Sequence, residues 1–251
     1  MSPTFEELVA EGASVPVEGW DFSWFQGRAT EERPPWGYSR LLGQRMAGAT
    51  AALDIQTGGG EVLAQIPQPP PRLVATESWP PNVEIARRNL APLGGTVVAV
   101  DDDADLPFPA DSFDLVVSRH PVQTRWDEVA RVLAPGGTFL SQMVGAGSVR
   151  ELTDAMMGPR VPSQARSPRR AAGQAEAAGL VVEDLRTAAL EMKFYDIAAV
   201  IVFLRKVIWT VPGFTIDRYR AQLAELHQRI RADGSFTAHS QRFLIEARKP
   251  R

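Results

Sequence analysis

The sequence predicts an α/β fold in which a mostly parallel β-sheet is covered by helices on both faces. From about residue 50, short apolar runs of strand length alternate with helical patterns, and this order of elements builds a parallel sheet. The chain has 251 residues, of which 44% are hydrophobic and 23% charged, which suits one well-buried core. Length and composition together exclude a fibrous or disordered protein.

The expected strands are short apolar runs that turn-forming residues separate from the helical patterns. Five of them fall within the first 145 residues, and an extended segment and a last strand lie nearer the end of the chain. They are residues 51–55, 72–76, 96–100, 113–118 and 137–143, followed by 180–192 and 236–247.

Helical patterns fill the intervals between these strands. The expected helices are residues 59–66, 80–91, 123–133, 147–157, 168–178, 197–209 and 215–232. Two prolines open residues 80–91 and suit a first helical turn, where no amide donor is needed. The turn Pro135-Gly136-Gly137 is expected to stop the helix over 123–133. Residues 197–209 are apolar nearly all round, so that helix is expected to be buried on most sides.

Composition excludes several classes of function. The chain has no cysteine, which removes disulfides, thiol nucleophiles and thiolate metal sites, and with only three scattered histidines we expect no metal. The formal net charge is −3, which does not suit a polycation built for phosphate backbones. The sequence shows neither a membrane-spanning run of ~18 apolar residues nor a targeting peptide, so we expect a cytoplasmic protein.

The glycine-rich segment LDIQTGGGE, residues 53–61, is the central functional indication. It follows an apolar strand and opens a predicted helix, where glycines let the backbone approach a ligand closely. Glu77 stands 17 residues after Gly60, roughly the spacing at which nucleoside-binding folds place a carboxylate on ribose hydroxyls. Glu61 replaces the cation that a triphosphate needs, and Leu63 replaces the third glycine of a dinucleotide fold. The pattern therefore favours a nucleoside without a pyrophosphate.

Residues 50–145 resemble class I S-adenosylmethionine-dependent methyltransferases. Besides the glycine-rich segment and Glu77, three aspartates at 101–103 follow the third strand, and VLAPGG at 132–137 precedes the fifth. The resemblance implies a Rossmann-like seven-stranded sheet whose last strand is antiparallel, and S-adenosyl-L-methionine as the cofactor. The sequence departs from the family at Gln56, where the family has glycine.

The resemblance also implies which residues bind the cofactor. They are Asp54, Gln56, Gly58, Gly60, Glu77, Ser78, Trp79, Asp102, Asp103 and Ser118. Asp54 is expected to orient the loop or to reach the amino group of the methionine moiety, and Glu77 to take both ribose hydroxyls. Trp79 is expected beside the adenine together with the residue before it, and Asp102 with the next amide is expected to read the adenine edge. Ser118 would lie where the strand order reverses, at the usual ligand position of open α/β sheets.

His120 is the candidate catalytic residue. Methyl transfer from a sulfonium is an in-line displacement, so much of the acceleration comes from holding the acceptor in line. Deprotonation of a hydroxyl acceptor by a general base increases the rate by a further ~10² to 10⁴-fold. His120 directly follows the fourth strand, and an imidazole has an ordinary pKa near ~6.5, so we expect a general base. A histidine that merely bonds the backbone is the alternative.

The acceptor is expected to be a small molecule, with oxygen favoured over nitrogen or carbon. Residues 118–121 do not match the Asn/Asp-Pro-Pro-aromatic motif of enzymes that methylate amide or exocyclic amine nitrogens. The stretches FYDI and WTVPGF, which begin at Phe194 and Trp209, are similar to those of uncharacterised bacterial methyltransferases.

An aromatic N-terminal arm, residues 1–48, and a helical insert at about 194–233 are expected to form a lid over a methyltransferase domain at 49–251. The candidate substrate-binding residues in these segments are Trp24, Arg28, Trp36, Tyr38, Phe194 and Tyr195. The alternative for the arm is that its rings pack as core.

Three other functions stay open from the sequence alone. Arginines between 160 and 170 could supply phosphate contacts for an rRNA or tRNA base methyltransferase. Gln56 could mark a regulatory protein that binds S-adenosylmethionine without turnover. A dehydrogenase would bind a nicotinamide instead. Monomer and homodimer are both compatible with the sequence.

Overall fold

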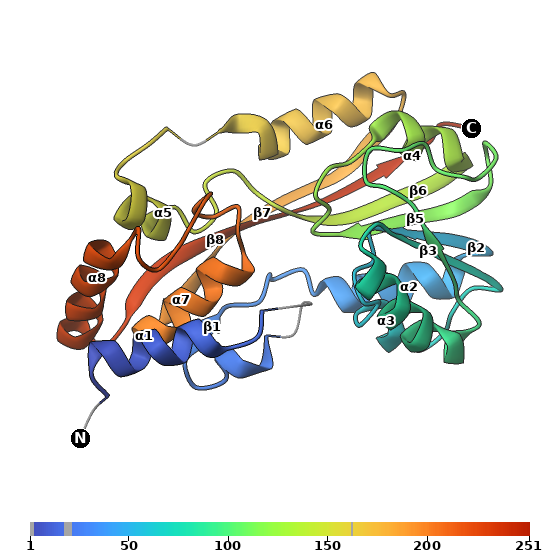
Figure 1. Cartoon of the computed structure of the whole chain (residues 1–251). Helices are drawn as coiled ribbons and strands as arrows, with labels where there is room; N and C mark the ends of the chain where they lie inside the picture. The colour runs from blue at the N-terminus through green and yellow to red at the C-terminus, as the bar shows by residue number, and fades with distance from the viewer. Residues whose placement is uncertain (1–2, 18–21, 162) are drawn as a thin grey trace. The chain divides into compact units, whose positions relative to one another are not determined.

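A computed structural model describes residues 3–17, 22–161 and 163–251. The chain divides into two compact units, whose elements are labelled in Figure 1. The core unit comprises Pro34–Gly145, Gln164–Ala188 and Arg242–Arg251, and the helical unit comprises Met1–Arg33, Ala146–Ser163 and Ala189–Gln241. Residues 34–48 of the expected arm therefore belong to the core unit.

The core unit is built on a largely parallel sheet. Its strands are β2 (Ala51–Ile55), β3 (Arg72–Glu77), β4 (Thr96–Ala99), β5 (Phe113–Arg119), β6 (Leu133–Val144), β7 (Val181–Phe194) and β8 (Phe236–Arg248), the last two continuing into segments of the helical unit. They lie in the order β7-β8-β6-β5-β2-β3-β4. Strands β2 to β6 pair in parallel, and β8 runs antiparallel to β6, with Ile245 opposite Ser141. The expected Rossmann-like sheet with an antiparallel last strand is confirmed, but among the described residues the sheet has eight strands rather than seven, because β1 (Ala29–Glu31) pairs with β7.

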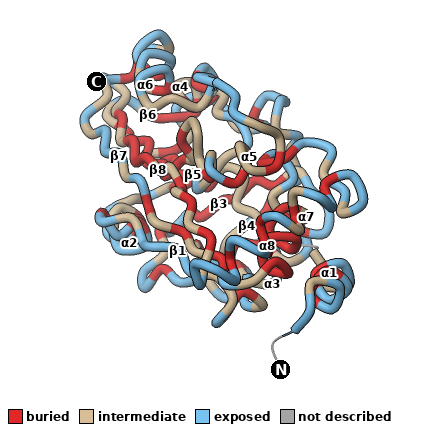
Figure 2. The backbone as a smooth tube through the Cα atoms, turned by 90° about the vertical axis from the view of Figure 1, so that its left-hand side faces the viewer, coloured by how far each residue is buried: buried red, intermediate tan, exposed pale blue. Residues whose placement is uncertain are grey.

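Apolar side chains on both faces of this sheet form two core layers. Ala52 belongs to one layer and Leu53 to the other, because successive side chains of a strand point to opposite faces. Helices α2 and α3 cover the first face and α4 and α6 the second (Figure 1). These helices are α2 (Tyr38–Gly48), α3 (Pro80–Leu90), α4 (Trp126–Val132) and α6 (Pro168–Ala177). Burial is therefore concentrated along the central strands (Figure 2).

The helix expected over residues 59–66 is absent, and that expectation is wrong. Turns and a single 3-10 helix, η2 (Leu63–Gln65), connect β2 to β3 instead. Ile66 has ψ of +133°, an extended conformation, and Pro67 follows it. A residue before proline is pushed out of the helical region, so the chain turns away before a second turn can form.

The turn expected at Pro135-Gly136-Gly137 is also different. Helix α4 is shorter than the expected 123–133, and β6 begins directly at Leu133, so these three residues lie within the strand. The pairing of β5 with β6 shifts register between Phe113 and Leu115, and this irregularity accommodates the proline and glycines.

The helical unit has an apolar core of its own. Its elements are α1 (Phe5–Ser14), η1 (Ser23–Phe25), β1 (Ala29–Glu31), α5 (Arg150–Met157), α7 (Ile197–Lys206) and α8 (Arg220–Asp233). Every residue of α7 from Ile197 to Leu204 is buried, as its all-round apolar pattern predicts. The unpredicted strand β1 pairs antiparallel with β7, placing Ala29 opposite Phe194.

The remaining expected elements are present with shifted ends. Helix α7 stops at Lys206 and α8 begins at Arg220, so both are shorter than their apolar patterns. Two further 3-10 turns are η3 (Ala91–Leu93) and η4 (Gln164–Arg166). In the described part of the chain, no helix has the length and apolar character to cross a bilayer, and no cluster of three or more His, Asp or Glu side chains could hold a metal ion.

Candidate functional site

The glycine-rich loop after β2 has an unusual backbone. Gln56, Gly58 and Gly60 have φ values of +57°, +65° and +74°, so every second residue is left-handed. Glycine adopts this conformation freely, whereas a glutamine is strained in it. Gly60 is also closely packed, because a Cβ on it would lie 3.2 Å from Cγ of Leu90. Gln56 therefore occupies a position whose backbone favours glycine.

Asp54 lies in β2 just before this loop. The residue is 8% exposed, and its carboxylate accepts a hydrogen bond from Oγ1 of Thr57 at 2.7 Å. Burial raises the pKa of Asp54 to about 7; Glu77 raises it too, whereas Thr57 and Arg119 oppose the rise. Of the two roles expected for Asp54, this contact supports orientation of the loop.

Glu77 ends β3 and connects that strand to the glycine-rich loop. The residue is 7% exposed, and its carboxylate accepts hydrogen bonds from the amides of Gly58 at 2.8 Å and Trp79 at 3.1 Å. Burial raises the pKa of Glu77, and these amides with the Asn82 side chain partly offset the rise. A carboxylate offers about four acceptor positions, so capacity remains for a hydroxyl donor.

Two further residues of the expected cofactor set follow Glu77. Ser78 is half-buried, and Trp79 precedes α3 with 42% of its surface exposed. An exposed indole beside a buried carboxylate is available to stack on a ligand ring.

A narrow cavity lies at the carboxyl ends of β2, β4 and β5. Its lining includes Gln56, Val100, Asp102, Ser118, Gln123 and Phe139. The cavity volume is about 30 Å³, the space of about two water molecules, and the cavity is partly open to solvent. Asp102 lines this cavity, whereas Asp103 is exposed and is not part of the lining.

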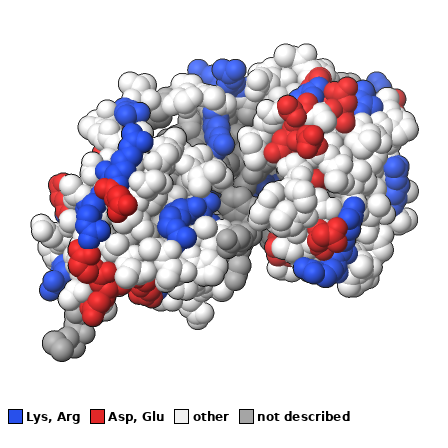
Figure 3. All heavy atoms as spheres, viewed as in Figure 1, with Lys and Arg blue, Asp and Glu red and all other residues white. Residues whose placement is uncertain are grey.

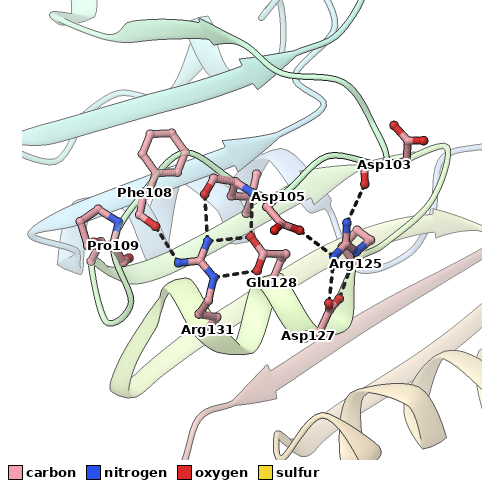
Figure 4. A network of polar contacts seen from close by, with 10 residues as sticks. Asp103, Asp105, Phe108, Pro109, Arg125, Asp127, Glu128 and Arg131 are labelled. Carbon is pink, nitrogen blue, oxygen red and sulfur yellow. Dashed lines mark hydrogen bonds and ion pairs between the residues drawn. The ribbon is translucent and has the colours of Figure 1, made fainter.

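Arg125 fixes the loop that carries these aspartates. It donates to the carbonyl oxygen of Asp103 at 2.6 Å and pairs with Asp105 at 3.0 Å and with Asp127 at 2.9 Å (Figure 4). Because the first two partners belong to the loop after β4 and Asp127 belongs to α4, the arginine ties the loop to the helix.

Arg131 ties the next part of the same loop to α4. It pairs with Glu128 at 2.6 Å and donates to the carbonyls of Leu106 and Phe108 (Figure 4). Glu128 in turn accepts the amide of Leu106 at 2.7 Å. Neither arginine is among the residues predicted from the sequence. The available signal was their position on a predicted helix that follows an acidic loop.

Ser118 stands opposite Ile55 in the pairing of β5 with β2, where the strand order reverses. Its hydroxyl donates to the carbonyl of Ile55 at 2.8 Å, and its own carbonyl accepts from the hydroxyl of Tyr38 at 3.1 Å. Burial raises the pKa of Tyr38 well above its ordinary value, so the phenol stays protonated. Tyr38, expected to contact substrate, is instead a buried residue that bonds the strand end.

His120 follows β5 and is held by a chain of side-chain contacts. Its Nε2 lies 3.0 Å from Nε2 of Gln142, whose Oε1 accepts from Nε1 of the buried Trp36 at 2.8 Å. An indole N–H can only donate, which directs the amide oxygen of Gln142 to Trp36 and its NH₂ to His120. Nε2 of His120 must therefore accept, and the neutral ring carries its proton on Nδ1.

This arrangement argues against the expected role of His120 as a general base. A base needs a free lone pair that faces the acceptor, but one ring nitrogen is engaged by Gln142 and the other is protonated. Burial lowers the pKa of His120 well below its ordinary value, and Arg119 and Arg242 lower it further. In this state His120 can donate a hydrogen bond but cannot take a proton. Trp36, expected to contact substrate, is likewise a buried partner of Gln142.

Two expected substrate residues of the helical unit, Trp24 and Arg28, contact each other. The Arg28 guanidinium lies 4.4 Å from the centre of the Trp24 ring and pairs with Glu11 and, at 2.8 Å, with Asp196. These carboxylates, Glu11 above all, raise the pKa of Arg28. Because two acids already balance its charge, Arg28 is a weaker candidate for binding a substrate carboxylate than expected.

Phe194 and Tyr195 differ in exposure. Phe194 is 0% exposed and packs edge-on against Phe203, with ring centres 5.3 Å apart. Core packing therefore accounts for Phe194 without a substrate contact. Tyr195 is 40% exposed, and its hydroxyl lies 3.3 Å from Oγ1 of Thr30. Of this pair, only Tyr195 is accessible to a ligand.

Comparison with known proteins identifies the class of the core unit. Residues 53–141 match the family described as a methyltransferase domain, which uses S-adenosyl-L-methionine. They therefore form a methyltransferase domain, and this domain indicates an S-adenosyl-L-methionine-dependent enzyme, as the sequence motifs predicted. No curated protein matches the chain.

Solved structures confirm the fold. The YcgJ protein from Bacillus subtilis has a TM-score of 0.62 at 19% identity, over 85% of this chain and 98% of its own. A functionally unknown protein from Deinococcus radiodurans has a TM-score of 0.60 at 16% identity, over 88% and 90%. Phosphoethanolamine N-methyltransferase 2 from Haemonchus contortus, solved with phosphomonomethylethanolamine and S-adenosylhomocysteine, has a TM-score of 0.50 at 16% identity, over 86% and 53%. At these identities the likeness establishes the Rossmann-like fold alone.

Proposed function

We propose that the core unit binds S-adenosyl-L-methionine across the carboxyl ends of β2, β3 and β4 and methylates a small molecule. The observation that carries the proposal is the Glu77 carboxylate, which is joined to the glycine-rich loop through the amide of Gly58 and retains acceptor capacity. Open α/β sheets bind their ligands at this edge, near the reversal of strand order.

The residues at this edge fit the chemistry of the cofactor. Bound S-adenosyl-L-methionine supplies an electrophilic methyl group. Glu77 would accept the ribose hydroxyls, Trp79 would stack on the adenine, and Asp102 would accept from its amino group. Asp54 would hold the glycine-rich loop through Thr57. The residues that would bind the cofactor thus lie at strand ends, whereas the helical unit is left to other roles.

The acceptor we propose is a small molecule that carries its own lone pair at neutral pH. A hydroxyl acceptor would need a general base, and Gln142 engages the nitrogen of His120 that would serve. A neutral amine or an already ionised oxygen needs no base, so either suits the geometry. The methyltransferase from Haemonchus contortus, which holds phosphomonomethylethanolamine, supports a small acceptor by analogy of fold.

The distribution of surface charge also favours a small acceptor over nucleic acid. On the face in view in Figure 3, acidic and basic side chains are interspersed, with no continuous basic surface among the described residues. A protein that holds phosphate backbones concentrates lysine and arginine along its binding surface. The lid expected from residues 1–48 and 194–233 stays a prediction.

Titration calorimetry with S-adenosylhomocysteine tests the cofactor site. Glu77→Ala removes the acceptor of a ribose hydroxyl, and a hydrogen bond to a charged group contributes about 1.5–3 kcal/mol, so the dissociation constant should rise by roughly 10- to 10²-fold. Glu84→Ala, which removes an exposed acid of α3, is the matched control and should leave the constant unchanged. Equal affinities in the two variants would overturn the assignment of Glu77.

A second candidate is a protein that binds the cofactor without methyl transfer. The observation that favours it is the Gln56 side chain, which lines the cavity where the adenine is expected. Incubation with methyl-labelled cofactor and a panel of amines, phenols and carboxylates separates the two functions. A labelled product supports methyl transfer, and cofactor binding without any labelled product supports the second candidate.

A further inference from the structure

The side-chain amide of Gln56 bridges the glycine-rich loop to the segment after β5. Its Oε1 accepts from the amide of Val122 at 2.6 Å, and its Nε2 donates to the carbonyl of Gln123 at 2.8 Å. One carboxamide thus satisfies two backbone groups of neighbouring residues, through a contact that spans 66 and 67 positions of the sequence. Both ends of the amide are used, which makes the orientation of Gln56 specific.

A second glutamine extends this bridge along the same edge of the sheet. The side chain of Gln123 donates to the carbonyl of Asp102 at 3.1 Å. Gln56 and Gln123 therefore connect, in series, the loops that follow β2, β5 and β4. Both side chains also line the cavity of about 30 Å³ described above. The two side chains that form the bridge are therefore also two of the side chains that narrow the cavity.

The backbone of Gln56 is strained at the place where the bridge begins. Its φ of +57° belongs to the left-handed region, in which glycine is favoured and a side chain is not. Strain of this kind persists where surrounding interactions hold it, and the two hydrogen bonds of the carboxamide are such interactions. Replacement by glycine would remove the strain and the bridge together.

We propose that Gln56 determines the affinity for the cofactor by holding the carboxyl edge of the sheet closed until the nucleoside displaces its side chain. This inference rests on the proposed function, because it takes the adenine to enter the cavity beside Asp102. The Gln56 side chain lines the cavity that the adenine would enter, so the bridge would have to open when the cofactor binds. The hydrogen bonds lost by Gln56 then oppose binding and weaken it.

Titration calorimetry with S-adenosylhomocysteine on the full chain, with tryptophan fluorescence as a second readout, tests this inference. Gln56→Gly and Gln56→Asn should each tighten binding by roughly tenfold, the equivalent of one net hydrogen bond. The asparagine is one methylene too short to bridge, yet it tolerates the left-handed backbone. If both variants bind S-adenosylhomocysteine equally tightly, the gain in affinity comes from loss of the bridge and not from relief of backbone strain.

Asp111→Gly is the matched control. Asp111 also has φ of +57° but is exposed and pairs with Lys249, outside the cavity lining. This variant relieves the same backbone strain, so its affinity for S-adenosylhomocysteine should equal that of the parent. Hydrogen exchange at Val122 should be faster in Gln56→Gly than in the parent, which verifies that the bridge is lost.

The outcomes distinguish this inference from the proposed function. If the parent binds S-adenosylhomocysteine and both Gln56 variants bind equally or more weakly, the bridge does not oppose binding and the inference is wrong, while the cofactor site stands. If neither the parent nor any variant binds, both the inference and the proposed cofactor site are wrong. Thermal unfolding of each variant confirms that the compared proteins are folded.

Discussion

The core unit and the helical unit place their charged residues in different surroundings. In the core unit, Glu77 and Asp102 stand at or after the ends of parallel strands, where backbone amides and a cavity surround them. In the helical unit, Arg28 is held between Glu11 and Asp196. We therefore expect the position of a charged residue at a strand end to predict the cofactor site better than its residue type does, because the carboxyl ends of parallel strands meet at one edge.

The aromatic arm shows the same contrast within one stretch of sequence. Trp36 and Tyr38 belong to the core unit and bond residues near the ends of β5 and β6. Trp24 belongs to the helical unit and stacks on Arg28. Density of aromatic residues alone predicted one substrate cap for all of them. Their partners show that the arm divides between two cores.

The largest expected effect tests whether the helical unit uses Phe194 for packing. Phe194→Ala should lower the free energy of unfolding by about 3–5 kcal/mol, since it removes a fully buried ring. Tyr195→Ala, at a neighbouring and partly exposed position, should cost much less, within about 1 kcal/mol. Urea denaturation measures both. Similar losses at the two positions would contradict the contrast between them.

The next effect concerns the buried carboxylates of the core unit. Asp54 has a pKa of about 7 when folded, against an ordinary 3.8, so the folded state binds more protons between these values. The contribution of Asp54 to the free energy of unfolding is therefore fully present below about pH 4 and is lost as the pH rises through 7. The loss is a few kcal/mol at most, because one pKa unit corresponds to about 1.4 kcal/mol.

Urea unfolding of Asp54→Asn between pH 4 and 8 checks this dependence. The difference in stability between parent and variant should change across that range, because the variant has no titrating group at this position. Asp101→Asn, at an exposed aspartate of the same unit, is the control. Its free energy of unfolding should change with pH in the same way as that of the parent. Parallel curves for Asp54→Asn as well would refute the raised pKa.

The smallest expected effect sharpens the account of His120. Nitrogen-15 NMR of the labelled protein should show a neutral imidazole with its proton on Nδ1 at pH 6 to 8, as the contact with Gln142 requires. Gln142→Glu should raise the pKa of His120 by on the order of one unit, since a carboxylate favours the charged ring. His239, which pairs with Glu151, serves as the internal control. A proton on Nε2 in the parent would restore the general-base hypothesis.

The bounds of the strands in the core unit could be predicted closely from the sequence. The main error was the helix predicted in the connection between β2 and β3. Apolar runs located β2 without a shift and β3 to within one residue. The helix expected over 59–66 failed because Pro67 ends it, a local rule that the apolar pattern concealed. The candidate cofactor residues could be proposed for the same reason as the strands. Each of them lies at the end of a strand or in the segment that follows it.

The sequence by itself determined the order of strands and helices, and with it which loops lie at the carboxyl edge of the sheet. Only the tertiary structure decided how the side chains at that edge bond one another. Trp36 and Gln142 are 106 positions apart, and Gln56 and Gln123 are 67 apart. The spacing of apolar residues along a helix or strand records which of its faces is buried, so it can be recognised within the sequence of that element. A hydrogen bond between distant side chains depends on how the elements pack, which no local pattern records.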